Sequence, residues 1–292
     1  MGSKNILIVC EGEATEQQII NNLQKIFFKD YIFNNYKISF QYYGNHVYSF
    51  YEMYTDLKKD EYIGIIALLK ENYTDKIKRL QNSKSQKGLD KLKKKLCELK
   101  EIEHTNPQVF LFFDYDAQGQ NTKYSDENIK ELLEFFSDET DNGKLYISYP
   151  MVEALKDFKK FDVCNRRCTV PAKTNIKYKN LANNESDFKD IRKLNEEYWF
   201  SVSEHSIKKS NCIIDTCGKY LLPDNYKQYQ NNFSQNNIFE KQILKFVIND
   251  KIAVLSAFPF FLIDYFGERF YEKITQNNGF TNILKIGKEN CL

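Results

Sequence analysis

Four acidic residues follow strand-like apolar runs in this sequence, and their types and positions could support metal chemistry. Glu11 comes directly after the first such run, Asp114 and Asp116 come directly after a second, and Glu153 lies just beyond a third. Several carboxylates can stay ionised close together only around a cation, and hard oxygen ligands suit Mg²⁺ or Mn²⁺. Such metals activate an attacking water and stabilise the leaving oxygen of a phosphodiester. The four residues are therefore candidates for metal-assisted phosphodiester cleavage.

The elements that must position these carboxylates alternate between strand and helix. Apolar, β-branched or aromatic runs predict strands at residues 4–10, 37–43, 108–113 and 144–149. Helical patterns lie between and after them, at residues 16–28, 56–103, 125–136 and from Pro150 onward. This alternation predicts an α/β fold, in which a mostly parallel sheet is covered by helices on both faces. Because the carboxyl ends of parallel strands share one edge, acids more than a hundred positions apart can converge there.

The chain changes character beyond about residue 160. Asn, Lys and Tyr become abundant, and residues 187–203 and 239–258 have mainly helical patterns. We therefore expect an α/β domain over residues 1–160, with a helical insertion at about 56–105, and a mainly α-helical domain over residues 161–292.

The composition excludes several classes of protein. Of the 292 residues, 42% are hydrophobic and 15% aromatic, which is enough for a packed core and excludes a wholly disordered chain. The net charge of +2 does not favour a uniformly basic nucleic-acid coat, although a local basic patch stays open. The lysine-rich stretch at residues 87–100 is interpreted as a solvated helical hairpin, with a polyanion-binding arm as the alternative.

No leader pattern begins the sequence, and the longest apolar run, residues 252–263, is too short to span a bilayer. We therefore expect a cytoplasmic protein without membrane contact.

Other catalytic and metal-binding motifs are missing from the sequence. The three histidines have no metal-ligand spacing, and neither a P-loop nor a G-x-S-x-G motif occurs. The seven cysteines are interpreted as ordinary reduced thiols, because their number is odd and no export signal is present. The pairs Cys164-x3-Cys168 and Cys212-x4-Cys217 leave a structural zinc site as the alternative.

Three segments of the chain resemble the toprim fold. They are Ile6-Leu7-Ile8-Val9-Cys10-Glu11-Gly12-Glu13, Phe110-Leu111-Phe112-Phe113-Asp114-Tyr115-Asp116 and Tyr149-Pro150-Met151-Val152-Glu153. The Glu-Gly-Glu-x-Thr-Glu form of the first is similar to the bacterial defence branch, which includes OLD-family nucleases, RloB-like proteins and the AriB effector of PARIS anti-phage systems. The resemblance covers about residues 4–160 and implies a toprim-like Rossmannoid parallel sheet flanked by helices.

The resemblance also implies roles for individual residues. Glu11 matches a glutamate that binds metal or acts as general acid/base, and Asp114 and Asp116 match the metal-binding D-x-D pair. The remaining matches are Glu153 as a further acid that completes the site, Gly12 as the glycine of a tight turn, and Glu16 as an optional supporting acid.

By this resemblance we expect a Mg²⁺- or Mn²⁺-dependent nuclease, the effector of an anti-phage defence system, whose substrate is DNA, transfer RNA or other RNA. Such an effector would be held by, or signalled from, an ABC-type ATPase partner, and a homodimer is expected. Phosphate contacts from the second domain are expected at Lys208, Lys209 and Arg166, whose simpler interpretation is solvated surface charge.

Other classes of protein stay open. A haloacid-dehalogenase-like phosphatase also uses an apolar strand followed by D-x-D, but there the motif normally lies near the N-terminus. A D-x-D glycosyltransferase would leave the Glu11-Gly12 strand end unexplained. The main alternative is a non-catalytic toprim-like sensor or scaffold, which would dock on an ABC-type ATPase through a face such as residues 256–262. That apolar segment is more commonly a buried core element.

Overall fold

The structure is a computed structural model of the chain. It describes residues 4–28, 36–58, 64–81, 86–115, 117, 123–157, 168–172, 175–185, 190–215 and 220–276.

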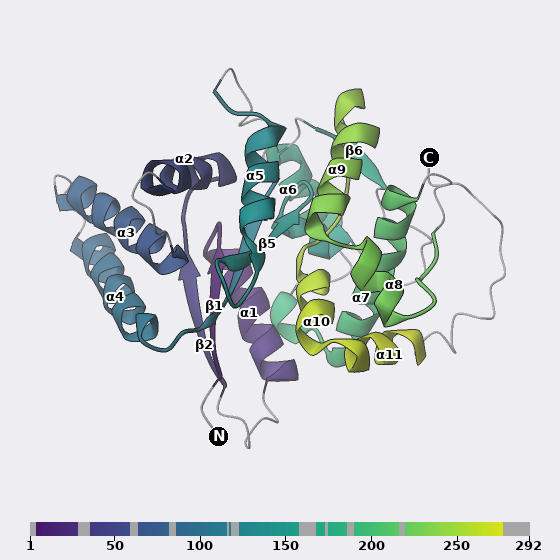
Figure 1. The fold of residues 1–292 in the computed structure, drawn as a ribbon, viewed down its shortest axis with the longest axis horizontal. Helices are drawn as coiled ribbons and strands as arrows, with labels where there is room; N and C mark the ends of the chain where they lie inside the picture. Colours follow the sequence, from purple (N-terminus) through teal and green to yellow (C-terminus); the bar gives the residue numbers. More distant parts are fainter. Residues whose placement is uncertain are drawn as a thin grey trace. The chain divides into compact units, whose positions relative to one another are not determined.

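The fold is α/β, with a mostly parallel five-stranded sheet flanked by helices, which confirms the α/β class predicted from the sequence (Figure 1). Strand β1 pairs in parallel with β2 on one side and β3 on the other, and the short β4 is antiparallel to β5. The strands lie in the order β2-β1-β3-β5-β4. Their bounds are β1 Lys4–Cys10, β2 Tyr36–Tyr42, β3 Gln108–Asp114, β4 Ser137–Asp138 and β5 Gly143–Ser148.

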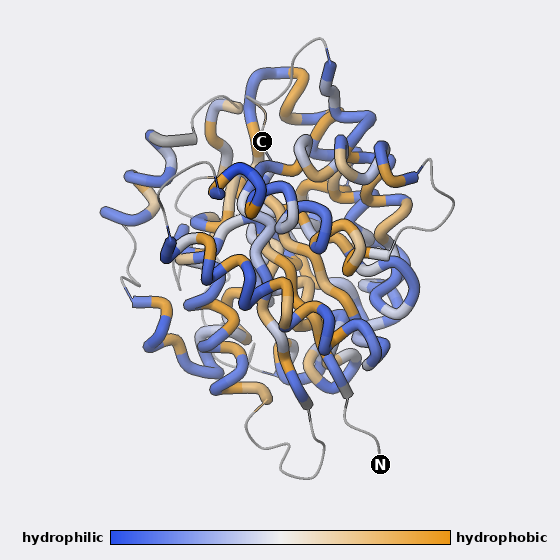
Figure 2. Tube along the Cα trace, turned by 90° about the vertical axis from the view of Figure 1, so that its left-hand side faces the viewer, coloured by the Kyte–Doolittle hydropathy of each residue, from blue (hydrophilic) through white to orange (hydrophobic). Residues whose placement is uncertain are grey.

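Continuous apolar runs form the inner strands because both faces of these strands are covered. The side chains from Ile6 to Cys10 in β1 are each at most 1% exposed, and those from Val109 to Phe113 in β3 are also buried. Figure 2 shows these strands as mainly hydrophobic, whereas the helices around them alternate between polar and apolar residues. Burial on both faces is typical of parallel strands between helical layers.

Clustering of contacts divides the chain into two compact units, and each unit is described by itself. The first unit comprises Met1–Phe112 and Glu127–Leu145, and the second comprises Phe113–Asp126 and Tyr146–Leu292. The helices of the first unit are α1 Ala14–Phe27, α2 Val47–Leu57, α3 Ile65–Gln81, α4 Gln86–Glu103 and α5 Asp126–Phe135.

The predicted helical insertion between β2 and β3 is present as α2, α3 and α4. It begins earlier than residue 56, because the His46 side chain accepts a hydrogen bond from the Ser49 N–H and caps α2. Helices α3 and α4 pack against each other as a hairpin (Figure 1). Residues Leu92, Leu99 and Ile102 are the buried positions of α4, so its lysines occupy the remaining faces.

The second unit is mainly helical in its described residues, and it also contains a small sheet. Strands β6 Thr169–Pro171 and β7 Lys251–Ala253 pair antiparallel. The described helices here are η2 Val152–Asp157, α6 Asn175–Glu185, η3 Ile191–Lys193, α7 Glu196–Ile214, α8 Tyr226–Asn232, α9 Gln235–Lys245, η4 Val247–Asn249, α10 Phe258–Phe266 and α11 Glu268–Gln276.

The mainly helical pattern predicted over residues 239–258 is confirmed only in its first part. Helix α9 ends at Lys245, and Asp250 adopts a left-handed conformation with φ of 54° before β7 begins. The Gln242 side chain then donates to the Ala253 carbonyl oxygen and accepts from the Ala253 N–H, at 2.7 and 3.1 Å. In this segment, the hydrogen bonds of the β6–β7 pair and of the Gln242 side chain take the place of helical hydrogen bonds.

The apolar segment 256–262 is buried. The side chains of residues 256–258 and 260–262 are each at most 3% exposed. It forms the start of α10 and its approach, so it belongs to the core of the second unit rather than to an exposed docking face. Among the described residues, no helix combines the length and the apolar character needed to cross a membrane.

Candidate active site

The strand connections create a switch point in the sheet. From β1 the chain passes through α1 to β2 on one side, and from β3 it passes through α5 toward β5 on the other side. Neighbouring parallel strands whose connections leave in opposite directions open a crevice at their carboxyl ends, where ligands bind in α/β folds. Glu11 is the residue after β1, and Asp114 is the last residue of β3.

The main chain of Glu11 is fixed from both sides within the first unit. Its N–H donates to the Phe112 carbonyl oxygen of β3, and its carbonyl oxygen accepts from the Gly44 N–H beyond β2, each at 2.8 Å. Gly44 has φ of 76°, a conformation that favours glycine. The Glu11 side chain is half-buried, so a rigid backbone presents a carboxylate that solvent can still reach.

Gly12 and Glu16 form a tight turn at the start of α1. The Gly12 N–H donates to Glu16 Oε1 at 3.0 Å, and the Glu16 side chain is buried. A Cβ atom on Gly12 would lie 2.6 Å from Glu16 Oε1, so glycine permits this contact. A carboxylate in the first turn also complements the helix dipole. The geometry shows that Glu16 holds the turn after Glu11 by accepting from the Gly12 N–H.

Two lysines from the helical insertion lie at this end of the first unit. The Lys76 ammonium donates to the Tyr43 carbonyl oxygen, next to Gly44, and burial lowers its pKa to about 8, with a further lowering from Arg79. Lys91 forms an ion pair with Glu13 at 2.5 Å, two residues beyond Glu11. Neither lysine is predicted individually from the sequence. The available signal was the lysine-rich stretch itself, which does not reveal which lysines face the strand ends.

In the second unit, hydrogen bonds hold the residue that directly follows Asp114. The Tyr115 N–H donates to the Ser148 carbonyl oxygen at the end of β5, at 2.9 Å. The buried Tyr115 hydroxyl donates to Asp126 Oδ1 at 2.8 Å, and its ring packs on Tyr149. The residue after Asp114 is therefore held firmly, while the Asp114 side chain is half-buried.

Glu153 is buried in η2 and already has a cationic neighbour. Its carboxylate is 1% exposed, and its Oε1 lies 3.2 Å from the Lys179 ammonium of α6. Lys156 also lies close enough to Glu153 for this carboxylate to raise the Lys156 pKa. Burial has the larger effect, however, and the Lys156 pKa is lowered. Within the second unit, this arrangement pairs a buried carboxylate with an exposed ammonium, and Glu153 could bind a metal only if Lys179 were displaced.

Two predicted site residues, Asp116 and Arg166, lie outside the described residues. Within the described part of the chain, no group of three or more His, Cys, Asp or Glu side chains is placed to hold a metal ion. The half-exposed carboxylates of Glu11 and Asp114 have the oxygen donors that Mg²⁺ and Mn²⁺ prefer. These two residues fit the predicted metal chemistry, whereas Glu153 as placed does not.

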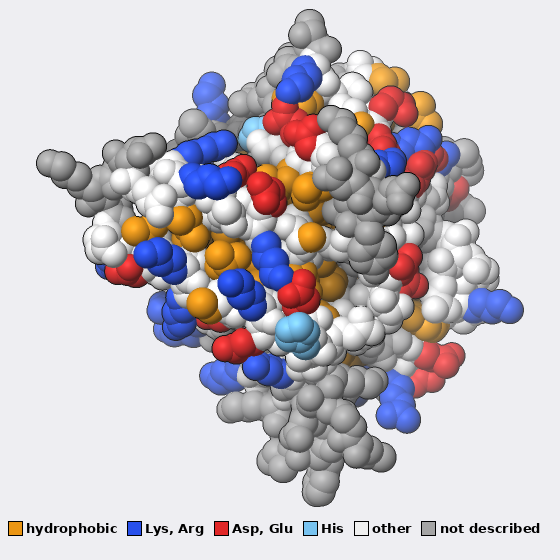
Figure 3. Space-filling view, turned by 60° about the vertical axis from the view of Figure 1, so that its left-hand side comes forward, with side chains coloured by type: hydrophobic (Ala, Val, Ile, Leu, Met, Phe, Trp, Pro, Cys, Tyr) orange, Lys and Arg blue, Asp and Glu red, His pale blue; other side chains and the backbone are white. Residues whose placement is uncertain are grey.

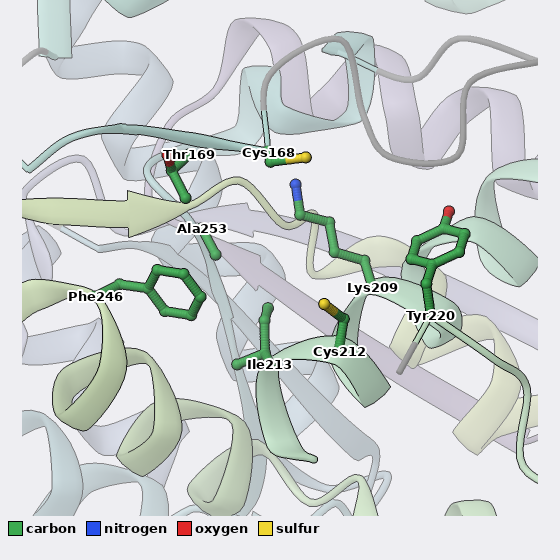
Figure 4. A pocket seen from close by; sticks show the side chains of 8 residues that line it. All are labelled: Cys168, Thr169, Lys209, Cys212, Ile213, Tyr220, Phe246 and Ala253. Carbon is green, nitrogen blue, oxygen red and sulfur yellow. The ribbon is translucent and has the colours of Figure 1, made fainter. Parts of the chain in front are cut away.

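The two described lysines predicted to contact phosphate are engaged elsewhere. Lys208 forms an ion pair with Glu204 one turn away on α7. Lys209 is 3% exposed and lines a small pocket with Cys168, Cys212 and Tyr220 (Figure 4). Neither arrangement presents an exposed ammonium to a phosphate.

The same pocket region corrects the expectation of a reduced thiol for one cysteine. Cys168 is disulfide-bonded, whereas Cys10, Cys97 and Cys212 are reduced, as expected. His205, which hydrogen-bonds with the Tyr220 hydroxyl, has its pKa lowered to about 3 by burial and by Lys209 and Lys208. This histidine is therefore neutral at physiological pH.

No protein-family model matches the chain, and no curated protein or solved structure matches it significantly.

We expect the substitutions Gly12→Ala and Glu16→Ala to be strongly non-additive. The Gly12→Ala methyl group displaces the Glu16 carboxylate and breaks a charged hydrogen bond, which should cost about 1.5–3 kcal/mol of unfolding free energy. In the Glu16→Ala background no carboxylate remains to displace, so Gly12→Ala should add little. Urea denaturation of the two single variants and the double variant measures this coupling. Additive losses would contradict the contact.

We expect Lys76 to make stability rise with pH between about 8 and 10.5. The pKa of the folded state is about 8, whereas a lysine in the unfolded chain keeps a pKa near 10.4. Between these values the unfolded state binds more protons, so wild type should gain stability relative to Lys76→Met as the pH rises. Urea denaturation at pH 7.5, 8.5 and 9.5 tests this. The exposed Lys78→Met is the control, and its difference from wild type should not change with pH.

We expect Lys179→Met to destabilise the protein more than Glu153→Gln. The first change leaves a buried carboxylate without its ion pair, whereas the second leaves only an exposed ammonium. The difference should be about 1–3 kcal/mol of unfolding free energy. Lys177→Met, an exposed lysine on the same helix, provides the control. Equal losses for Lys179→Met and Glu153→Gln would show that the pair does not hold Glu153.

Proposed function

We propose that the protein is a metal-dependent nuclease of the toprim type that cleaves nucleic-acid phosphodiesters. The observation that carries this proposal is the position of Glu11 and Asp114 after neighbouring parallel strands whose connections leave in opposite directions. This is the edge at which α/β folds bind ligands, and the acids there have the donor chemistry of a Mg²⁺ or Mn²⁺ site.

The proposal assigns each residue a separate task. By resemblance, Glu11 would bind metal or move a proton at the attacking water, and Asp114 and Asp116 would act as metal ligands. The metal, when bound, polarises phosphate oxygens and lowers the pKa of water. Gly12 and Glu16 keep the Glu11 backbone in place. Glu153 would join the metal ligands only after its ion pair with Lys179 opens, so we assign it a supporting role.

By resemblance we further propose that the nuclease is an effector of anti-phage defence, that an ABC-type ATPase partner controls it, and that it works as a homodimer in the cytoplasm. The non-catalytic scaffold has less support, because the segment 256–262 suggested as its docking face is buried.

Cleavage of a nucleic-acid panel tests the proposed function. Plasmid DNA, single-stranded DNA, total RNA and transfer RNA would be incubated with the full chain in Mg²⁺ or Mn²⁺, or in EDTA. We expect metal-dependent cutting that falls at least about a hundredfold in Glu11→Ala and in Asp114→Ala, the scale of lost acid–base or charge stabilisation. The exposed acid Glu134→Ala on α5 is the control and should cut like wild type.

The outcomes separate the two classes of function. Cutting that survives Glu11→Ala, or that proceeds in EDTA, would contradict the assigned site. If no substrate is cut, calorimetric titration with Mn²⁺ decides between the classes. Binding lost in Glu11→Ala would indicate a silent enzyme, and the absence of binding would favour a scaffold.

A further inference from the structure

The α3–α4 hairpin carries an excess of positive charge. Helices α3 and α4 together contain ten Lys and Arg against six Asp and Glu, a net charge of +4. The whole chain has a net charge of only +2, so the rest of the chain is net negative. Figure 3 turns this side of the first unit forward and shows Lys and Arg side chains interspersed with hydrophobic ones. The positive charge of the protein is therefore concentrated on one structural element.

Two of these lysines pair with aromatic rings of β2. The Lys91 ammonium lies 5.3 Å from the centre of the Tyr42 ring, and the Lys95 ammonium lies 5.8 Å from the centre of the Phe40 ring. Lys95 also donates to the Phe40 carbonyl oxygen at 2.7 Å. Both rings are half-buried and lie on one face of β2, which is an edge strand of the sheet.

The spacing of the two pairs shows how α4 runs along this strand. Four helical residues advance about 6 Å, and two strand residues advance about 6.6 Å, so both pairs can form at once. Because the earlier lysine pairs with the later strand residue, α4 runs opposite to β2. Residues of α4 that precede Lys91 therefore lie toward the carboxyl end of β2. Lys91 also reaches Glu13, which places this end of the helix near the Glu11 strand end.

Further lysines extend the row on the same helical face. Lys87 lies one turn before Lys91, and Lys94 lies one turn after it. Both are exposed, and neither forms an ion pair with a carboxylate among the described residues. The lysine row, defined as Lys87, Lys91, Lys94 and Lys95, thus combines two exposed ammonium groups, of Lys87 and Lys94, with two lysines packed on aromatic rings, and it leads toward Glu11. Lys95 also forms an ion pair with Glu98 at 3.1 Å.

We propose that the lysine row, with Phe40 and Tyr42, binds single-stranded nucleic acid and guides its backbone to the carboxyl end of β1. Ammonium groups neutralise phosphates, and half-exposed rings offer stacking surfaces to unpaired bases. A duplex keeps its bases stacked within itself, so these rings favour a single strand. An acidic protein surface would use the charges but not the rings. This inference rests on the proposed function for its biological role, but binding can be measured without cleavage.

Fluorescence anisotropy in EDTA tests the proposal with the full chain. The probes are labelled twelve-nucleotide single-stranded DNA and RNA, the matching duplex DNA, and polyglutamate as a charge-only competitor. The double variant Lys87→Glu/Lys94→Glu reverses two exposed charges of the row. Lys227→Glu/Lys251→Glu makes the same net charge change at exposed lysines of the second unit and serves as the matched control. Circular dichroism verifies that each variant is folded.

We expect Lys87→Glu/Lys94→Glu to weaken single-strand binding at least about tenfold and to reduce the salt slope of log K by about 1.4, the value for two phosphate contacts. The control should stay within about twofold of wild type. Phe40→Leu should weaken binding of the single strand without changing the salt slope, because it removes stacking and no charge. These results together would support the single-strand site.

Equal losses in the row variant and its control would overturn the proposal, because net charge alone would then explain binding. Duplex DNA or polyglutamate binding as tightly as the single strand would also overturn it, and polyglutamate would indicate an acidic protein partner. The failures of the two proposals are distinguishable. Row-dependent binding without any cutting would contradict only the nuclease, whereas metal-dependent cutting unchanged by the row variant would contradict only the row.

Discussion

Buried main-chain polar groups need hydrogen-bond partners, and this requirement governs the centre of the first unit. Strand β1 is covered on both faces, so its N–H and carbonyl groups can be satisfied only by strands on either side. The bonds continue one residue beyond the strand, to Glu11, which is held by Phe112 and by Gly44. The chain must then turn away at once into α1, which explains why a glycine and a capping carboxylate follow directly. The half-exposed Glu11 side chain is the polar group that this constraint places at the sheet edge.

The helical insertion also contributes polar contacts to the same unit. Besides its buried apolar side chains, its lysines contact strand ends that lie far away in sequence. Lys76 bonds to the Tyr43 carbonyl oxygen, and Lys91 pairs with Glu13. The two contacts partly desolvate the ammonium groups of both lysines. They also place cationic charge next to the acids, in keeping with a site that handles an anion.

The strands and the acids after them could be predicted because long apolar runs have few alternatives in a soluble α/β protein. Other features depend on partners distant in sequence and could not. The segment 239–258 looks helical locally, but β7 pairs with β6 about eighty residues earlier, and this pairing overrides local propensity. Glu153 was recognised as an acid near a strand end, whereas its pairing with Lys179 depends on how α6 packs on η2. Helical periodicity predicts the lysine hairpin but not the register that places Lys91 over Tyr42.

The division of the chain has a consequence for how the protein is made. The second unit takes Phe113–Asp126 from the middle of the first, and the first is completed only by Glu127–Leu145. During synthesis, the first unit therefore lacks its final segment until residue 145 has left the ribosome. The segment Phe113–Asp126, which contains Asp114, can pack only after the later part of the second unit has been made. Cotranslational folding usually proceeds domain by domain from the N-terminus. Here the segment Phe113–Asp126, which contains the candidate acid Asp114, belongs to the unit whose remaining residues are made last, so an incomplete chain would carry Glu11 before Asp114 has reached its final position.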